Sequence, residues 1–126
     1  MSGFAFDANI IIDALAGYAP AQSEIARAVT MGSRPWISRM AWIEVLSKGS
    51  EAVVREALGF LGHFGMDEID EEISLRAAAL RRERPRLKSP DAIILATAQL
   101  RGRILVTRNT GDFPAEMPGI RVPYIL

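Results

Sequence analysis

Four acidic residues stand where a chain of alternating strands and helices would leave a sheet or begin a helix, and they are the best candidates for chemistry. Asp7 follows the apolar stretch that opens the chain, and Asp112 follows the β-branched run at 103–107. Glu44 and Asp91 lie on amphipathic or apolar helical patterns. Carboxylates within about 4–6 Å of one another raise each other's pKa, so a divalent cation stabilises such a group. The four positions therefore predict an acidic, metal-binding site.

Any metal ion must be held by oxygen, because the chain has no cysteine and only one histidine, His63. Mg²⁺ and Mn²⁺ prefer carboxylate and water oxygens and commonly keep several waters. Such an ion lowers the pKa of a water from about 15.7 towards neutrality and stabilises negative charge on a phosphoryl group. The residues therefore favour phosphodiester hydrolysis without a histidine or a cysteine.

Each acid also has a purely structural interpretation. Asp91, in the first turn of a helix, interacts favourably with the helix dipole by roughly 0.3–1 kcal/mol. Glu44 precedes Lys48 by four residues and can pair with it on one helix face. Asn109 and Asp112 belong to an NTGD sequence of a kind that is ordinary in turns. No single position decides between the two interpretations, so the site depends on the acids meeting.

Hydrophobic patterning predicts the elements that must bring these acids together. Short apolar runs alternating with helical spacings are typical of a mainly parallel sheet covered on both faces. We therefore expect an α/β fold, a three-layer α/β/α sandwich, formed by residues 1–126 as one domain. If the first and fourth strands are neighbours, Asp7 and Asp112 face one crevice, with Asp91 at its rim. The expected strands are 4–6, 35–38, 64–69, 103–107 and 120–125, and the expected helices are 10–15, 22–31, 38–49, 50–61, 70–85 and 89–101.

Local signals mark several element ends. Ser38, Asp70 and Ser89 are the expected N-cap residues of three helices. Gly102 is expected to end the last helix. Pro123 restricts the last strand to an edge of the sheet.

Length and composition exclude several classes. The 126 residues are 49% hydrophobic and 24% charged, far from the composition of a disordered chain. No apolar run reaches the roughly 18 residues that cross a bilayer, and the first residues lack a signal-peptide pattern. We therefore expect a cytoplasmic protein with no membrane association. Trp36 and Trp42 are expected to pack in the core, with stacking on nucleic-acid bases as the alternative.

The net charge of zero conceals two segments of opposite sign. Residues 1–75 contain 11 acidic and 5 basic residues, whereas residues 76–103 contain 8 basic and 2 acidic residues. Five basic residues closely precede Asp91, and they form either a solvated helix end or a surface that binds RNA phosphates beside the acids. Their position favours RNA binding. These residues are Arg81, Arg82, Arg84, Arg86 and Lys88.

Four segments together resemble the four motifs of PIN-domain ribonucleases, especially the VapC-type toxins of toxin–antitoxin pairs: FDANIIIDAL, SRMAWIEVLSKG, SPDAIILATAQLRG and LVTRNTGDF. The resemblance spans nearly the whole chain, and the third and fourth segments are the most specific. It implies a PIN-like fold and an Mg²⁺- or Mn²⁺-dependent endoribonuclease that acts as a toxin. The implied site binds one or two ions. Its acids are Asp7, Glu44, Asp91 and Asp112, with support from Thr107 and Asn109.

The resemblance also implies a division of roles. Asp7 and Asp91 contact the metal, Asp112 completes the site directly or through water, and Glu44 orients a water. An activated water attacks the phosphorus and the 3′ oxygen leaves, while two ions would stabilise both oxygens. Ala8 stands where the family usually has Ser or Thr. We expect the missing hydroxyl to weaken metal binding, because loss of a group that hydrogen-bonds to a metal ligand commonly lowers metal affinity or activity by about 10–100-fold.

The partners implied by the resemblance are an RNA substrate, a cognate antitoxin and a second copy of the toxin. In the family, a C-terminal antitoxin segment wraps the toxin and often reaches the acidic crevice. The helices expected at 22–31 and 50–61 would supply apolar surfaces for these contacts. The same apolar stripes would equally serve packing within the chain.

Two other interpretations are weaker. In haloacid dehalogenase-like phosphatases, a nucleophile at Asp7 would need a second Asp two residues later, where this chain has Asn9. A receiver domain needs an acidic pair and a late lysine, and the only lysines are Lys48 and Lys88. A catalytically silent PIN-like module that binds RNA or protein remains the alternative, and the retained acids disfavour it.

Overall fold

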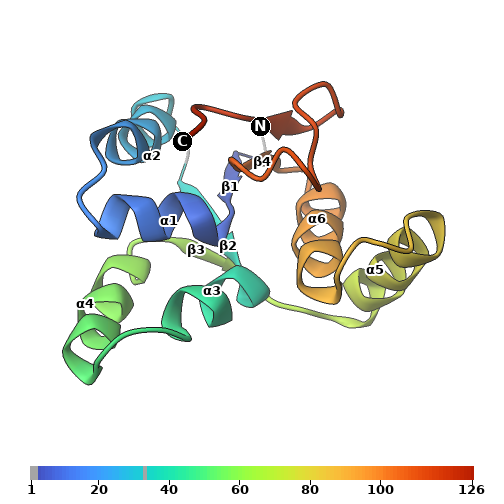
Figure 1. The fold of residues 1–126 in the computed structure, drawn as a ribbon, viewed down its shortest axis with the longest axis horizontal. Coiled ribbons are helices and arrows are strands. Elements are labelled where there is room, and N and C mark those ends of the chain that lie inside the picture. The colour runs from blue at the N-terminus through green and yellow to red at the C-terminus, as the bar shows by residue number, and fades with distance from the viewer. Residues whose placement is uncertain (1–2, 33) are drawn as a thin grey trace.

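A computed structural model describes residues 3–32 and 34–126 (Figure 1). Within these residues, strands and helices alternate along the chain. The strands are β1 (Phe4–Phe6), β2 (Pro35–Ser38), β3 (Gly65–Asp67), β4 (Ile104–Val106) and β5 (Ile120–Arg121). The helices are α1 (Ala8–Leu15), α2 (Ala19–Thr30), α3 (Arg39–Leu46), α4 (Glu51–Leu61), α5 (Glu71–Glu83) and α6 (Ser89–Arg101).

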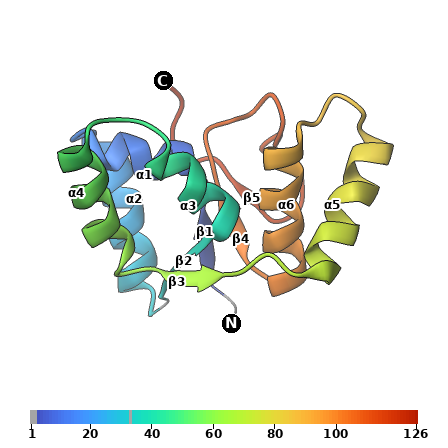
Figure 2. The same ribbon diagram turned by 90° about the horizontal axis from the view of Figure 1, so that it is seen from below.

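The strands form one sheet in the order β3-β2-β1-β4-β5, and every pairing is parallel. Helices α1, α2 and α4 lie on one face of this sheet, and α5 and α6 lie on the other (Figures 1 and 2). Helix α3 follows β2 directly and packs against both α1 and α6. The predicted α/β/α sandwich with a parallel sheet is therefore confirmed, and the first and fourth strands are neighbours.

The largest buried side chains come from the central strands and the helices beside them. Phe6 on β1, Ile37 on β2 and Leu105 on β4 are each no more than 1% exposed, and Ile10 and Ile11 on α1 are fully buried. Full burial of a side chain of this size stabilises the fold by about 1.5–3 kcal/mol. The polar residues that follow β1 and β4 therefore extend from a rigid base.

The helix starts agree with the sequence at two of the three predicted N-caps. The Ser38 hydroxyl accepts a hydrogen bond from an amide of α3, and the Asp70 carboxylate accepts one from an amide of α5. Ser89 is wrong as an N-cap, because it is the first residue of α6 and Lys88 is the N-cap, without a side-chain bond. A polar cap is less needed there because Pro90, in the first turn, has no amide hydrogen to satisfy.

Other differences concern the ends of elements. Helix α1 begins two residues earlier than expected because the Asp7 carboxylate caps it. Helix α2 begins at 19, since Pro20 occupies its first turn instead of interrupting it. The last strand has two residues, 120–121, and lies at the sheet edge as predicted. Gly102, with φ 67°, ends α6 in the left-handed conformation that glycine adopts without strain.

The two tryptophans are partly buried rather than fully enclosed. The ring of Trp36 packs under the guanidinium of Arg103, 3.6 Å from the ring centroid, and Arg39 lies over Trp42 at 4.6 Å. Both rings therefore take part in packing. Among residues 3–32 and 34–126, no helix is long and apolar enough to cross a membrane.

Candidate active site

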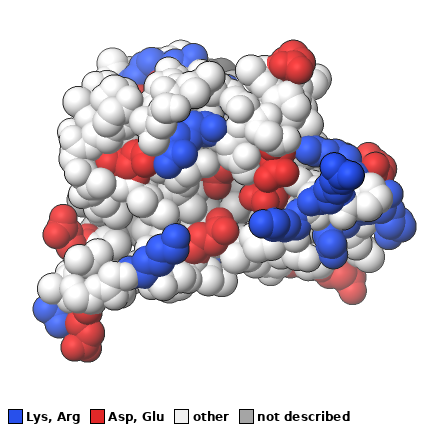
Figure 3. Space-filling view, viewed as in Figure 1, with Lys and Arg blue, Asp and Glu red and all other residues white. Residues whose placement is uncertain are grey.

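A cleft opens at the carboxyl ends of β1 and β4, where the order of the strands reverses direction. In open parallel sheets this switch point is the usual place for a ligand. The cleft has a volume of about 640 Å³ and is lined from α1, α3, α6 and the loop after β4. Figure 3 shows acidic patches near the middle of this face, with basic patches around them. The lining includes Asp7, Glu44, Asp91 and Asn109.

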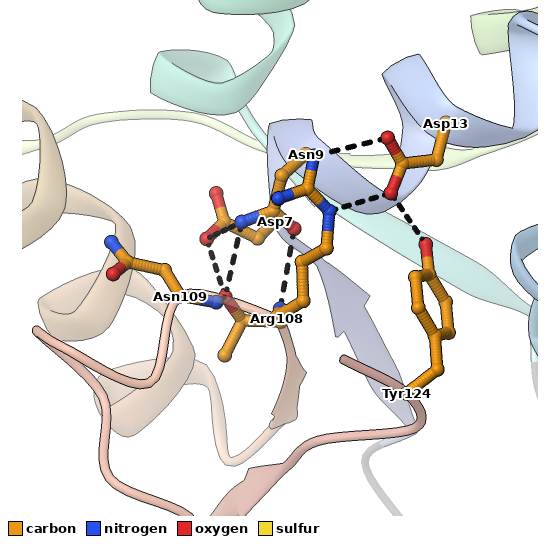
Figure 4. A network of polar contacts seen from close by, with 7 residues as sticks. Asp7, Asn9, Asp13, Arg108, Asn109 and Tyr124 are labelled. Carbon is orange, nitrogen blue, oxygen red and sulfur yellow. Dashed lines mark hydrogen bonds and ion pairs between the residues drawn. The ribbon is translucent and has the colours of Figure 1, made fainter. Parts of the chain in front are cut away.

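Asp7 is the most enclosed of the four predicted acids, with 4% of its surface exposed. Its Oδ1 accepts a hydrogen bond from the Ala8 amide at 2.7 Å. Its Oδ2 accepts one from the Thr107 hydroxyl at 2.8 Å and one from Asn9 Nδ2 at 3.3 Å (Figure 4). Burial raises the pKa of Asp7, and the hydrogen bonds from Thr107 and Ala8 offset only part of that effect. Asp7 is thus a fixed carboxylate whose charge is poorly compensated.

Glu44 and Asp91 face the same cleft from the two helices on either side. Burial, together with the neighbouring charges of Asp112 and Asp7, raises the pKa of Asp91 to about 6. Burial also raises the pKa of Glu44, as do the charges of Asp7 and Asp91. These acids therefore act on one another electrostatically, although their elements are far apart in the chain.

Asp112 lies in an adjoining hollow rather than in the wall of the main cleft. Asn109 Nδ2 donates a hydrogen bond of 2.9 Å to Asp112 Oδ2, and the Asp112 amide donates one of 3.3 Å to Asn109 Oδ1. The Asn109 amide in turn donates to the Thr107 hydroxyl at 3.0 Å. The segment after β4 thus links Asp112 to Asp7 through Thr107 and Asn109.

The kind of donor present here suits Mg²⁺ or Mn²⁺. Within the described residues, no group of three or more His, Asp or Glu side chains is arranged so that it could hold a metal ion. Mg²⁺ is commonly bound through only one or two carboxylates and keeps several waters. A cation would also relieve the repulsion that raises the pKa values of Asp91 and Glu44. The cleft fits such an ion in chemistry, without presenting a complete set of ligands.

The predicted RNA-binding residues divide into two groups. Arg81 Nε donates to the Leu87 carbonyl at 2.9 Å, and Arg84 donates to the Asp112 carbonyl, so both guanidinium groups brace the loop between α5 and α6. Arg82 and Arg86 make no hydrogen bond or ion pair with any described residue and are exposed. The fifth residue, Lys88, is exposed at the start of α6 and lowers the pKa of Asp91 by its charge.

Sequence reasoning missed a polar network beside Asp7 (Figure 4). Arg108 forms a bidentate ion pair with Asp13 of α1, and the Tyr124 hydroxyl also donates to Asp13. Asn9 donates to both Asp7 and Thr107. The one sequence signal for this network is that Arg108 stands between two predicted site residues, Thr107 and Asn109.

The comparisons with known proteins identify the family. The sequence-family model described as PIN domain matches residues 4–115 of this chain. The chain therefore belongs to the PIN-domain family, as the resemblance of the four segments predicts. A search of curated proteins found no match.

Solved structures extend this similarity. The chain is similar to one in a toxin–antitoxin complex from Klebsiella pneumoniae, with 38% identity, a TM-score of 0.87 and coverage of 98% of this chain and 99% of that chain. It shares its fold with DNA-bound VapBC from Salmonella typhimurium, at 23% identity, a TM-score of 0.75 and 96% coverage of each chain. The chain also shares its fold with FitAcB from Neisseria gonorrhoeae, at 18% identity, with a TM-score of 0.74 and coverage of 98% of this chain and 99% of that chain. The predicted likeness to VapC-type PIN proteins is confirmed.

Proposed function

We propose that this protein is the toxin of a toxin–antitoxin pair and acts as an Mg²⁺- or Mn²⁺-dependent endoribonuclease. The observation that carries the proposal is the electrostatic coupling of four acids from four separate segments in and beside one cleft: Asp7, Glu44, Asp91 and Asp112. A fold that only needed to be stable would gain nothing from carboxylates that raise one another's pKa. The PIN family and the 38% identity to a chain of a toxin–antitoxin complex support the same conclusion.

In this proposal, Asp7 and Asp91 bind the ion, and Asp112 completes the site directly or through water. Asp7 is suited to this role because its hydrogen bonds to Ala8 and Thr107 fix the orientation of its carboxylate. When bound, the divalent ion supplies an activated water and stabilises charge on the phosphate. Glu44 faces the cleft from the opposite wall and orients the attacking water.

The outer partners of the site are Thr107 and Asn109. Thr107 gives Asp7 a hydroxyl donor from the end of β4, and Asn109 holds Asp112 through its amide. Asp7 therefore keeps one hydroxyl partner, Thr107, although Ala8 at the start of α1 has none. We expect the absence of a hydroxyl at this position to cost less metal affinity than it would without Thr107.

The RNA strand would approach from the loop between α5 and α6. Arg82, Arg86 and Lys88 have charged groups exposed to solvent there, and Lys88 is three residues before Asp91. Arg81 and Arg84 shape the same loop through their bonds to backbone carbonyls. Phosphate contacts from such residues give affinity that falls as salt rises.

A cognate antitoxin and a second copy of the chain are the proposed protein partners. Between α1, α2 and α4 lies a groove whose apolar lining includes Leu15, Ile25 and Phe60. Val53 and Leu58 on α4 are 53% and 45% exposed. These surfaces correspond to the helices expected to supply partner contacts. Exposed apolar side chains of this size are typical of helix-in-groove binding.

The experiment that tests the proposal is RNA cleavage by the purified chain, free of any antitoxin, in Mg²⁺ or Mn²⁺ and in a chelator. We expect cleavage with metal and none with chelator. Asp7→Asn and Asp91→Asn should abolish cleavage and keep the fold. Asp70→Asn is the matched control, because Asp70 caps α5 outside the cleft and asparagine caps equally well. Cleavage by the two cleft variants at the parental rate would refute the site.

The second candidate is a catalytically silent PIN-like module that binds RNA or protein. The observation that favours it is the absence of three acids arranged to hold an ion within the described residues. This candidate predicts RNA binding without cleavage under every metal condition. It also predicts unimpaired growth of cells that express the chain alone, whereas the toxin proposal predicts growth arrest that Asp91→Asn relieves.

A further inference from the structure

Arg108 is held in the wall of the cleft by a buried acid. Its Nε and Nη2 donate hydrogen bonds of 2.6 and 3.1 Å to the two carboxylate oxygens of Asp13. Asp13 belongs to α1 and is 9% exposed, whereas the Arg108 side chain is 30% exposed. A bidentate pair of this kind fixes the plane of the guanidinium as well as its position.

A third residue fixes Asp13 from the end of the chain. The Tyr124 hydroxyl donates a 2.8 Å hydrogen bond to Asp13 Oδ2, and the Tyr124 ring packs edge-on against Tyr18, with 5.0 Å between ring centroids. The hydrogen bond from Arg108 lowers the pKa of Asp13, so Asp13 stays ionised at neutral pH. Residues from two distant parts of the sequence, Asp13 and Tyr124, therefore hold the Arg108 guanidinium in place.

The rest of the guanidinium is available to a ligand. Arginine has five N–H donors, and the bonds to Asp13 use only one edge of the fork. Arg108 Nη1 makes no hydrogen bond to any residue in 3–32 or 34–126. Figure 4 shows the guanidinium between Asp13 and Asp7, and both Asp7 and Arg108 line the cleft.

Charge gives this arrangement a specific use. An RNA phosphate that enters the cleft meets the negative charges of Asp7, Glu44 and Asp91. A rigid guanidinium in the same wall offsets that repulsion and matches two phosphate oxygens at once. The cleft also has Lys48 in its lining, but Lys48 is an exposed side chain without a bidentate partner.

We propose that Arg108 binds a phosphate of the RNA strand in the cleft and that Asp13 and Tyr124 are positioning residues that aim its guanidinium. The proposal rests on the proposed function in taking RNA as the substrate. It differs from the general RNA-binding role of the basic loop, because Arg108 comes from the opposite side of the cleft, after β4. The strand would then be held on both sides of the acids.

The test is binding of a short, fluorescently labelled single-stranded RNA at several salt concentrations, in an Asp91→Asn background that prevents cleavage. We expect Arg108→Met to raise Kd about tenfold or more, as for loss of one charge-assisted contact. The slope of log affinity against log salt should fall by about 0.7. Arg121→Met is the matched control, since Arg121 forms a similar bidentate pair with Glu24 away from the cleft. Equal Kd and slope for Arg108→Met and its parent would overturn the proposal.

Two milder variants separate binding from folding. Arg108→Lys keeps the charge but loses the fork, and Tyr124→Phe removes only the hydroxyl on Asp13. In the active protein we expect Tyr124→Phe to raise KM severalfold with little change in kcat. A purely structural role would lower Tm and leave the salt slope and KM unchanged, which would also overturn the proposal.

The outcomes distinguish this inference from the function on which it rests. If the parental protein binds RNA through Arg108 but does not cleave it with Mg²⁺ or Mn²⁺, the endoribonuclease proposal fails and the phosphate contact stands. If the parent cleaves RNA and Arg108→Met binds and cleaves equally well, the contact is refuted and the endoribonuclease stands.

Discussion

Replacing Asp91 with asparagine should stabilise the metal-free protein at alkaline pH. The folded pKa of Asp91 is about 6, compared with an ordinary value of 3.8, because of burial and the charges of Asp112 and Asp7. The folded state therefore holds its proton more tightly than the unfolded state does. This tighter proton binding adds to the free energy of unfolding. The contribution is fully present below pH about 4 and is lost as pH rises through about 6.

The structure sets the size of this effect. A shift of about two pKa units corresponds to at most about 3 kcal/mol. Asp91 is only partly buried, and solvent screening reduces that ceiling to roughly 1–1.5 kcal/mol. For a chain of this length, we expect Asp91→Asn to raise Tm by about 3–6 °C at pH 8 and by almost nothing at pH 4.

The assay is thermal unfolding of parent and variant at pH 4 and pH 8, in chelator and in Mg²⁺. Mg²⁺ should raise the Tm of the parent at pH 8 and have little effect on Asp91→Asn. The control of opposite sign is Asp13→Asn, which should lower Tm at pH 8 because Arg108 stabilises the ionised Asp13. If Asp91→Asn lowers Tm at pH 8, or changes it equally at both pH values, the coupling of the acids is refuted.

Two further predictions concern the basic loop and the sheet. Arg86→Gln should weaken RNA binding and reduce its salt dependence without changing Tm, whereas Arg81→Gln should lower Tm because it loses the hydrogen bond to the Leu87 carbonyl. RNA titrations and melting curves check both variants. If the salt dependence of RNA binding is unchanged in Arg86→Gln, Arg86 does not contact RNA. Gly65→Ala should destabilise the fold by about 1–3 kcal/mol, because the added Cβ would lie 2.5 Å from the Trp36 ring. Denaturant unfolding measures this change. If the variant is as stable as the parent, the Trp36 ring moves aside at no cost.

Much of the fold could be predicted because its signals are local. Ser38 and Asp70 precede their helices as caps, and Gly102 ends α6 with a positive φ. The apolar runs predict β1 and β4, and Asp7 and Asp112 lie in the segments that follow these strands. The prediction of Ser89 as an N-cap is wrong because sequence alone does not distinguish the residue before a helix from its first residue when proline follows.

The candidate site was less predictable where it depends on long-range contacts. Acids at strand ends and helix starts could be chosen as candidates from their types and positions. The pairing of Arg108 with Asp13 joins residues that are 95 positions apart, and Tyr124 lies 111 positions from Asp13. No periodicity or spacing marks such a contact. Likewise, nothing local indicated that Arg81 and Arg84 bond to backbone carbonyls.

The central claim is that acids from separate segments share one divalent ion, and Mn²⁺ binding followed by electron paramagnetic resonance tests it most directly. The metal-free protein should bind one or two Mn²⁺ ions. Asp7→Asn and Asp91→Asn should each weaken that binding by at least about tenfold, and Asp70→Asn should leave it unchanged. Equal Mn²⁺ binding by all four proteins, or no binding by the parent, would contradict the account.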